Sequence, residues 1–261
     1  MTESFLLIEG CVKMDKYSGL AYVYDQIMDH VPYDKWVHDL KDIFKEYDHN
    51  PVRVLDCACG TGAMSNRLAS MGYVVTGIDL SEDMLVRAQE NAMEDELRVR
   101  YLLMDMTKIV MKEKFDAVVS YFDGVNYLLE KSDLSDFFTG IERVLNPGGI
   151  FVFDISTAFK MEDTLGKNTF AESHEDLAFI WENFYDQASR TLQFDMTMFL
   201  EEENGLFERH YESHHLKAHS VEEIKAAMPE GLEFLKVIDG DDMGEIKDNS
   251  ERVLFIIKKK K

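Results

Sequence analysis

Short apolar runs alternate with amphipathic segments through the first 160 residues. Five runs have the length and composition of buried strands, at 52–56, 73–79, 99–104, 115–122 and 150–154. The intervening and preceding segments are predicted helices, at 20–30, 32–47, 63–70, 82–93 and 133–145. Ser81 and Ser132 are the predicted N-caps of the last two. Repeated strand–helix units favour a parallel sheet with right-handed crossovers.

The pattern changes after about residue 160. Three segments have the character of strands with no helix between them, at 179–185, 192–201 and 206–216. Asn204-Gly205, between the last two, predicts a tight type I′ hairpin turn, which needs positive φ at both central positions. We therefore interpret residues 160–218 as an antiparallel insertion.

The end of the chain returns to the first pattern. Ser220 is the predicted N-cap of a helix that reaches about Met228, and 232–238 and 253–257 are closing strands. The predicted fold class is α/β, a doubly wound seven-stranded sheet with an antiparallel insertion after strand five. We expect lid helices in 1–50, the α/β domain in 51–159 and 219–261, and the insertion in 160–218.

Charge narrows the range of partners. The chain has 50 acidic and 28 basic residues and a formal net charge of −22. Such a surface repels a phosphate backbone unless a local basic patch overrides it. The only dense basic run is 258–261, which we interpret as a solvated tail. A small or cationic acceptor is therefore expected, and nucleic acid is not.

Cysteine content and apolar runs bear on location. Cys11, Cys57 and Cys59 cannot form a disulfide framework, and their spacing, CxC without a second pair, favours small buried residues over a metal site. No apolar run approaches the roughly 20 residues of a membrane span. The apolar stretch 5–8 is too short for a signal peptide. We expect a cytoplasmic protein without membrane contact or bound metal.

A glycine turn with an acid before it is the main chemical motif. Gly60 and Gly62 would let the backbone approach a ligand closely between a strand and a helix. A dinucleotide fingerprint would carry glycine or alanine where Ser65 stands. Asp56, just before the turn, suits a cation such as an ammonium or sulfonium better than a pyrophosphate.

Two further acids follow the next two strands. Asp79 can accept both hydroxyls of a ribose, and Asp105 can accept from an adenine amino group. Met106 offers the ring an apolar surface and a backbone N–H. Because parallel strands end at one edge of the sheet, the three acids together indicate a site for a positively charged nucleoside.

These residues resemble the motifs of class I S-adenosylmethionine-dependent methyltransferases, which have a Rossmann-like sheet. Residues 55–62 are similar to the first motif, 77–81 with Met84 to the second, Asp105-Met106 to the third, and 145–150 to the turn before strand five. The resemblance implies S-adenosylmethionine as cofactor. The residues that it and the motifs place at the cofactor are Tyr17, Tyr24, Trp36, Asp56, Ala58, Gly60, Thr61, Gly62, Asp79, Leu80, Met84, Asp105, Met106 and Phe122.

A closer resemblance exists to a subgroup that includes uncharacterised bacterial methyltransferases and amino-sugar N,N-dimethyltransferases. Residues 21–25 and 32–36 look like its lid helices, and Glu212-Ser213-His214 is similar to a Glu-Ser-His run of the sugar enzymes. Tyr127 stands where those enzymes carry a histidine. The resemblance implies an acceptor site near Asp123 and Asn126, which we expect to bind substrate.

The strand predicted at 206–216 offers proton-handling groups. Its period of two places His210, Glu212 and His214 on one face. Such a face can be a solvated surface, a base oriented by an acid, or a metal site. With the resemblance, we expect His214, Glu212 and Tyr127 to be the catalytic residues.

The sequence therefore predicts methyl transfer from S-adenosylmethionine to an amine or hydroxyl of a small molecule. Three alternatives stay open at this point: an RNA- or ribosome-associated methyltransferase, a nicotinamide-dependent oxidoreductase, and a nucleoside-binding regulator without catalysis. Neither the acceptor nor the oligomeric state follows from the sequence.

Overall fold

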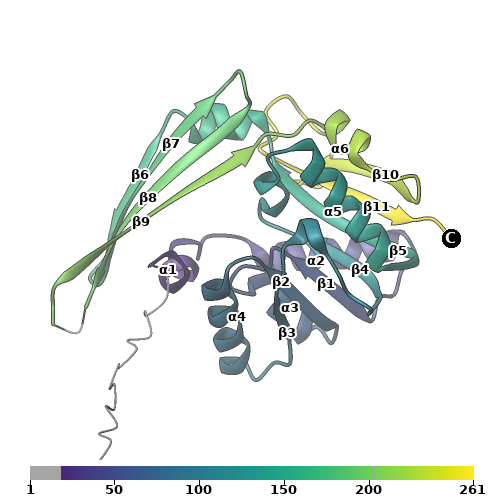
Figure 1. The fold of residues 1–261 in the computed structure, drawn as a ribbon, viewed down its shortest axis with the longest axis horizontal. Coiled ribbons are helices and arrows are strands. Elements are labelled where there is room, and N and C mark those ends of the chain that lie inside the picture. Colours follow the sequence, from purple (N-terminus) through teal and green to yellow (C-terminus); the bar gives the residue numbers. More distant parts are fainter. Residues whose placement is uncertain (1–18, 203) are drawn as a thin grey trace, which may run out of the picture.

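The computed structural model describes residues 19–202 and 204–261. Its centre is a seven-stranded sheet with the order β10-β11-β5-β4-β1-β2-β3 (Figure 1). Five strands are parallel: β1 (Arg53–Cys57), β2 (Val74–Asp79), β3 (Arg100–Leu103), β4 (Phe115–Ser120) and β5 (Leu145–Ser156). At one edge β11 (Arg252–Lys259) runs antiparallel to both β5 and β10 (Leu232–Asp239). The predicted doubly wound fold is confirmed.

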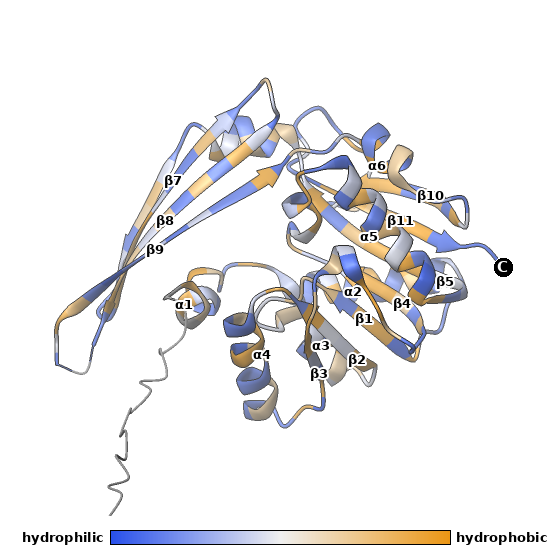
Figure 2. Ribbon diagram, in the orientation of Figure 1, coloured by the Kyte–Doolittle hydropathy of each residue, from blue (hydrophilic) through white to orange (hydrophobic). Residues whose placement is uncertain are grey.

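Helices cover both faces of this sheet. α2 (Tyr33–Glu46) and α3 (Ala63–Ser70) pack on one face, and α5 (Lys131–Val144) and α6 (Val221–Ala227) pack on the other. α4 (Glu82–Glu94) lies beside β2 and β3. Hydrophobic colour runs along the central strands in Figure 2, as expected for strands that are buried on both sides. Within the described residues, no helix is long and apolar enough to cross a membrane.

A second, antiparallel sheet follows β5 in the chain, and we call it the inserted sheet. Its strands are β6 (Thr169–Ser173), β7 (Leu177–Asp186), β8 (Thr191–Glu201) and β9 (Phe207–Lys217). It extends away from the central sheet and passes over α1 (Gly19–Ile27) (Figure 1). Burial alternates along β8, so one face of the inserted sheet is covered and the other is open.

Two hydrophobic clusters cover the buried face of the inserted sheet. One joins Leu20 and Val23 of α1 to Met198 and its neighbours. The other joins Met161, in the π-helix Lys160–Leu165, to Leu192 and its neighbours. The same face of the inserted sheet carries the polar side chains of His210, Glu212 and His214 from β9.

Two predicted helix caps are confirmed and one is wrong. Ser81 accepts a hydrogen bond from the N–H of Met84 at 3.3 Å, and Ser220 forms a capping box with Glu223. α5 instead begins after Glu130, whose extended backbone makes it the N-cap, and Ser132 lies inside the first turn.

Several boundaries also differ from the prediction. β5 begins at Leu145, because the predicted turn at 146–149 is an irregularity within its pairing to β4. The hairpin near Asn204 is not a two-residue type I′ turn. Gly205 (φ 74°) donates its N–H to the carbonyl of Glu202, and Glu202 donates its N–H to the carbonyl of Leu206, so the hairpin closes between Glu202 and Leu206. β6 and the π-helix were not predicted.

Candidate functional site

The turn between β1 and α3 brings the backbone beside open space. Ala58, Gly60 and Gly62 have φ values of 55°, 52° and 81°. A Cβ atom at Gly60 would meet nothing within 4 Å, whereas one at Gly62 would collide with the Tyr101 hydroxyl. Gly60 thus leaves room for a ligand against the backbone, while Gly62 is required for packing.

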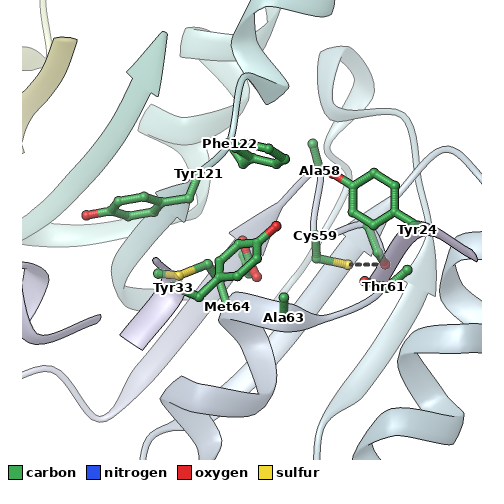
Figure 3. A pocket seen from close by; sticks show the side chains of 11 residues that line it. Tyr24, Tyr33, Ala58, Cys59, Thr61, Ala63, Met64, Tyr121 and Phe122 are labelled. Atoms are coloured by element: carbon green, nitrogen blue, oxygen red, sulfur yellow. Dashed lines mark hydrogen bonds between the residues drawn. The ribbon is translucent and has the colours of Figure 1, made fainter. Parts of the chain in front are cut away.

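A recess with a volume of about 40 Å³ opens to the surface beside this turn. Tyr24 of α1 and Tyr33 of α2 line this recess together with Phe122, which follows β4 (Figure 3). Six predicted cofactor residues come together here: Tyr24, Asp56, Ala58, Gly60, Thr61 and Phe122. Five others also line the recess: Tyr33, Cys59, Ala63, Met64 and Tyr121.

Asp56 is the buried acid of this recess. It is 1% exposed and accepts a hydrogen bond from the Ser65 hydroxyl at 2.6 Å. Burial raises the pKa of Asp56 to about 7; the Ser65 hydrogen bond opposes this rise, and the charge of Asp79 adds to it. No basic side chain among the described residues forms an ion pair with Asp56. A cationic ligand would supply the missing opposite charge.

Asp79 ends β2 and Asp105 lies shortly after β3, at the same edge of the central sheet as Asp56. Asp79 accepts hydrogen bonds from the N–H of Gly60 at 2.8 Å and of Ser81 at 2.9 Å, and burial raises its pKa. Asp105 accepts from Thr107 and forms an ion pair with exposed Lys108. Asp79 therefore joins the glycine turn to the end of β2, while the Asp105 carboxylate is already occupied by local partners.

Three apolar predicted residues lie along this edge. Leu80, beside Asp79, is 72% exposed, so its side chain is available to cover the adenine ring of a bound cofactor. Met84 is half-buried and packs toward the α1 cluster, and Met106 is half-buried against the central core. The strand ends thus combine acidic and apolar groups, as a nucleoside requires.

The lid differs in part from the prediction. Trp36 is 4% exposed and does not line the recess; it stacks on Tyr121 and lies under the guanidinium of Arg252, 3.9 Å from its ring centre. Its direct contact with the cofactor stays a prediction, whereas Tyr33 of the same helix lines the recess. Tyr17 lies outside the described residues.

The predicted catalytic residues form one hydrogen-bonded chain. The Tyr127 hydroxyl lies 3.2 Å from Nδ1 of His214, and Nε2 of His214 lies 3.2 Å from a Glu212 oxygen. The imidazole stacks on Phe194, with ring centres 4.6 Å apart. Because a carboxylate only accepts, Nε2 carries the proton that it shares with Glu212, and Nδ1 is the acceptor. Tyr127 is 45% exposed as a residue; partial desolvation of its hydroxyl, followed by the charges of Asp123, Asp79 and Glu212, raises the pKa of that hydroxyl.

The two predicted substrate residues have different surroundings. Asp123 has φ 67°, accepts from the Ser156 hydroxyl at 2.7 Å, and lies 3.7 Å from the ammonium of Lys160. Asn126 is fully buried and bonds only to backbone groups of Ser156 and Lys217. Asn126 therefore fixes the end of β9 to β5, and its role in substrate binding stays a prediction.

Sequence reasoning missed some residues of the site. Tyr33 and Met64 line the recess, and Phe194 supports the His214 ring. Phe194 could have been found from register, because it pairs directly with His214 across β8 and β9. Within the described residues, no group of three or more His, Cys, Asp or Glu side chains could hold a metal ion.

Comparisons with known proteins agree with this geometry. A family model described as "Methyltransferase domain" matches residues 54–149. YqeM of Bacillus subtilis (strain 168), named as a methyltransferase, is 37% identical over 94% of this chain and 98% of its own length. The dTDP-3-amino-3,4,6-trideoxy-alpha-D-glucopyranose N,N-dimethyltransferase of Streptomyces venezuelae is 31% identical over 44% of this chain and 47% of its own length.

One solved structure extends the similarity to almost the whole fold. It is the S-adenosylmethionine-dependent methyltransferase of Clostridium acetobutylicum ATCC 824, which is 26% identical. It covers 93% of this chain and 98% of its own, with a TM-score of 0.82. The chain belongs to the class I S-adenosylmethionine-dependent methyltransferases.

Proposed function

We propose that this methyltransferase acts on an amine or hydroxyl group of a small molecule. The observation that supports the proposal is the hydrogen-bonded Tyr127–His214–Glu212 chain, in which His214 would act as a base oriented by Glu212. A nucleophile that must lose a proton needs such a base. When bound, S-adenosylmethionine would supply an electrophilic methyl carbon: the acceptor atom would bond to that carbon while the carbon–sulfur bond breaks and the neutral thioether, S-adenosylhomocysteine, leaves.

The hydrogen bonds among Tyr127, His214 and Glu212 would direct a proton from the acceptor toward His214. Tyr127 donates to Nδ1 of His214, so the lone pairs of the Tyr127 oxygen can accept a proton from an acceptor N–H or O–H. The Tyr127 proton then passes to His214, and Glu212 stabilises the imidazolium that forms. General base catalysis of this kind contributes on the order of 100-fold or more to a rate.

The residues of the recess fit the cofactor. Asp56 would face the positively charged end of the cofactor, and the open backbone at Gly60 would let the cofactor lie against the chain. Asp79 and Leu80 would contact its adenosine. Tyr24, Tyr33 and Phe122 would exclude water at the reacting end. The inserted sheet is then the acceptor side of the molecule.

The charge of the acceptor side supports a small polar or cationic substrate over RNA. Asp79, Asp123 and Glu212 all act on Tyr127 electrostatically, and the net charge of the whole chain is −22. The similar Streptomyces venezuelae enzyme is named for an amino-sugar substrate. We also propose a cytoplasmic location, where Cys57 and Cys59 would stay reduced as the free thiols that they are here.

A labelled-methyl screen tests this function. Purified protein is incubated with methyl-labelled S-adenosylmethionine and panels of amines, amino sugars, hydroxylated metabolites and RNA. We expect transfer to a small amine or alcohol, with thermal stabilisation by S-adenosylmethionine and its demethylated product but not by NAD. Transfer to RNA alone, or no transfer by protein that binds the cofactor, would contradict the proposal.

A further inference from the structure

Helix α1 touches both halves of the site. Leu20, Val23 and Ile27 are at most 9% exposed and pack into the hydrophobic cluster on the inserted sheet. Tyr24, on another side of the same helix, lines the recess. A nine-residue helix is only about 13 Å long and moves as one body, so a contact at either end affects the other.

Asp25 attaches this helix to the glycine turn. One carboxylate oxygen accepts from the Thr61 hydroxyl at 2.5 Å. The other accepts from the Asn91 amide at 2.8 Å and from Arg87 at 3.3 Å. Asn91 also donates to the carbonyl of Thr61 at 3.1 Å. Thr61 is 1% exposed and lines the recess, so Asp25 is joined to the turn directly through the Thr61 hydroxyl and indirectly through Asn91.

The amino terminus of α1 bonds to the proposed catalytic chain. The N–H of Leu20 donates to one oxygen of Glu212 at 3.1 Å, and the other oxygen of Glu212 faces His214. The first N–H groups of a helix have no partner within it, and a carboxylate there is stabilised by the helix dipole. The position of Glu212 thus depends on whether α1 is in place.

We propose that Asp25 is a positioning residue that couples cofactor binding to the base. Its hydrogen bond to Thr61 fixes α1 against the glycine turn, which we call the seated position of α1. In that position the Leu20 N–H of α1 orients Glu212, and Glu212 in turn orients His214. Cofactor in the recess fixes Thr61 and Tyr24, which stabilises seated α1. By linkage, seated α1 must in turn strengthen cofactor binding. Acceptor activation is then greatest once the cofactor is bound. The inference rests on the proposed role of His214 but does not need the acceptor to be known.

Hydrogen exchange with S-adenosylhomocysteine as the probe tests this coupling. In the wild-type chain, saturating probe should slow exchange in peptides covering 20–27 and 207–217. In Asp25→Asn, probe affinity should fall about five- to tenfold, and the protection of 207–217 at saturation should fall to less than a third. Asp29→Asn is the matched control, since Asp29 is 83% exposed just beyond α1 and loses the same charge.

Two further measurements separate positioning from misfolding. Thr61→Val removes only the hydroxyl and should reproduce the Asp25→Asn result, whereas Thr61→Ser should retain wild-type protection. The ring ¹⁵N shifts of His214 should report one dominant tautomer with probe in the wild type and a mixture in Asp25→Asn. Wild-type protection of 207–217 and unchanged His214 shifts in Asp25→Asn would overturn the inference.

The outcome is distinguishable from that of the acceptor screen. Exchange and ¹⁵N shifts are read without any acceptor, so they can fail while a small molecule is methylated. Conversely, a screen that finds only RNA as acceptor would remove the proposed function and leave the measured coupling in place.

Discussion

The two sheets of this molecule assemble their functional side chains differently. In the central sheet, Asp56 and Asp79 lie at the carboxyl ends of β1 and β2, and Asp105 follows β3; these three strands are neighbours that end at one edge. In the inserted sheet, His214 meets Tyr127, which lies 87 positions earlier in the chain. The proposed cofactor half therefore depends on local motifs repeated along the chain, and the proposed acceptor half depends on how the two sheets are joined.

The largest expected effect is on the cofactor half. Asp79→Asn should weaken S-adenosylmethionine binding about 100-fold, because an amide cannot accept from the N–H of both Gly60 and Ser81, and each charge-assisted bond contributes about 1.5–3 kcal/mol. Calorimetry measures the Kd. Asp95→Asn, an exposed acid beyond α4, is the control and should bind normally. Binding of Asp79→Asn within threefold of wild type would contradict this arrangement.

The next effect concerns the joint between the sheets. Asn126→Ala should lower the free energy of unfolding by about 2–3 kcal/mol, because it leaves buried backbone groups of Ser156 and Lys217 without partners. Denaturant titration measures the loss. Asn204→Ala, in the exposed hairpin loop, should change stability little. Equal stability of the two variants would show that Asn126 does not join the sheets.

A smaller effect concerns the pH dependence of cofactor binding at Asp56. Because the pKa of Asp56 is raised to about 7, a bound cation must favour its ionised form and release a proton. S-adenosylmethionine affinity should therefore rise about tenfold between pH 5.5 and 8, whereas the uncharged-sulfur product should show a weaker rise. In Asp56→Asn the dependence should flatten; an unchanged slope would place the titrating group elsewhere.

The same pKa has the opposite consequence for folding without ligand. A carboxyl whose pKa is raised by burial binds its proton more tightly in the folded state, so stability is lost as pH rises from about 4 through about 7. Thermal unfolding of the unliganded protein over this range should show that loss, and Asp56→Asn should show less of it.

The sequence predicted the central sheet well because its signals are local. Strand ends, the glycine turn and the Ser81 and Ser220 caps each depend on a few adjacent residues. β6 was missed because all five of its residues are exposed, so it has no apolar pattern. Whether Tyr33 or Trp36 faced the recess could not be read from helical spacing, since both are buried on α2. The backbone partners of Asn126 could not be predicted, because they lie 30 and 91 residues away in the chain.

His214→Ala tests most directly whether the central sheet binds the cofactor while the inserted sheet supplies the base. Its cofactor Kd and its turnover on the acceptor from the screen are measured on the same preparation. We expect turnover to fall about 100-fold, as loss of a general base requires, while the Kd stays within twofold of wild type. Unchanged turnover, or a Kd that rises in step with the loss, would contradict the assignment of the base to the inserted sheet.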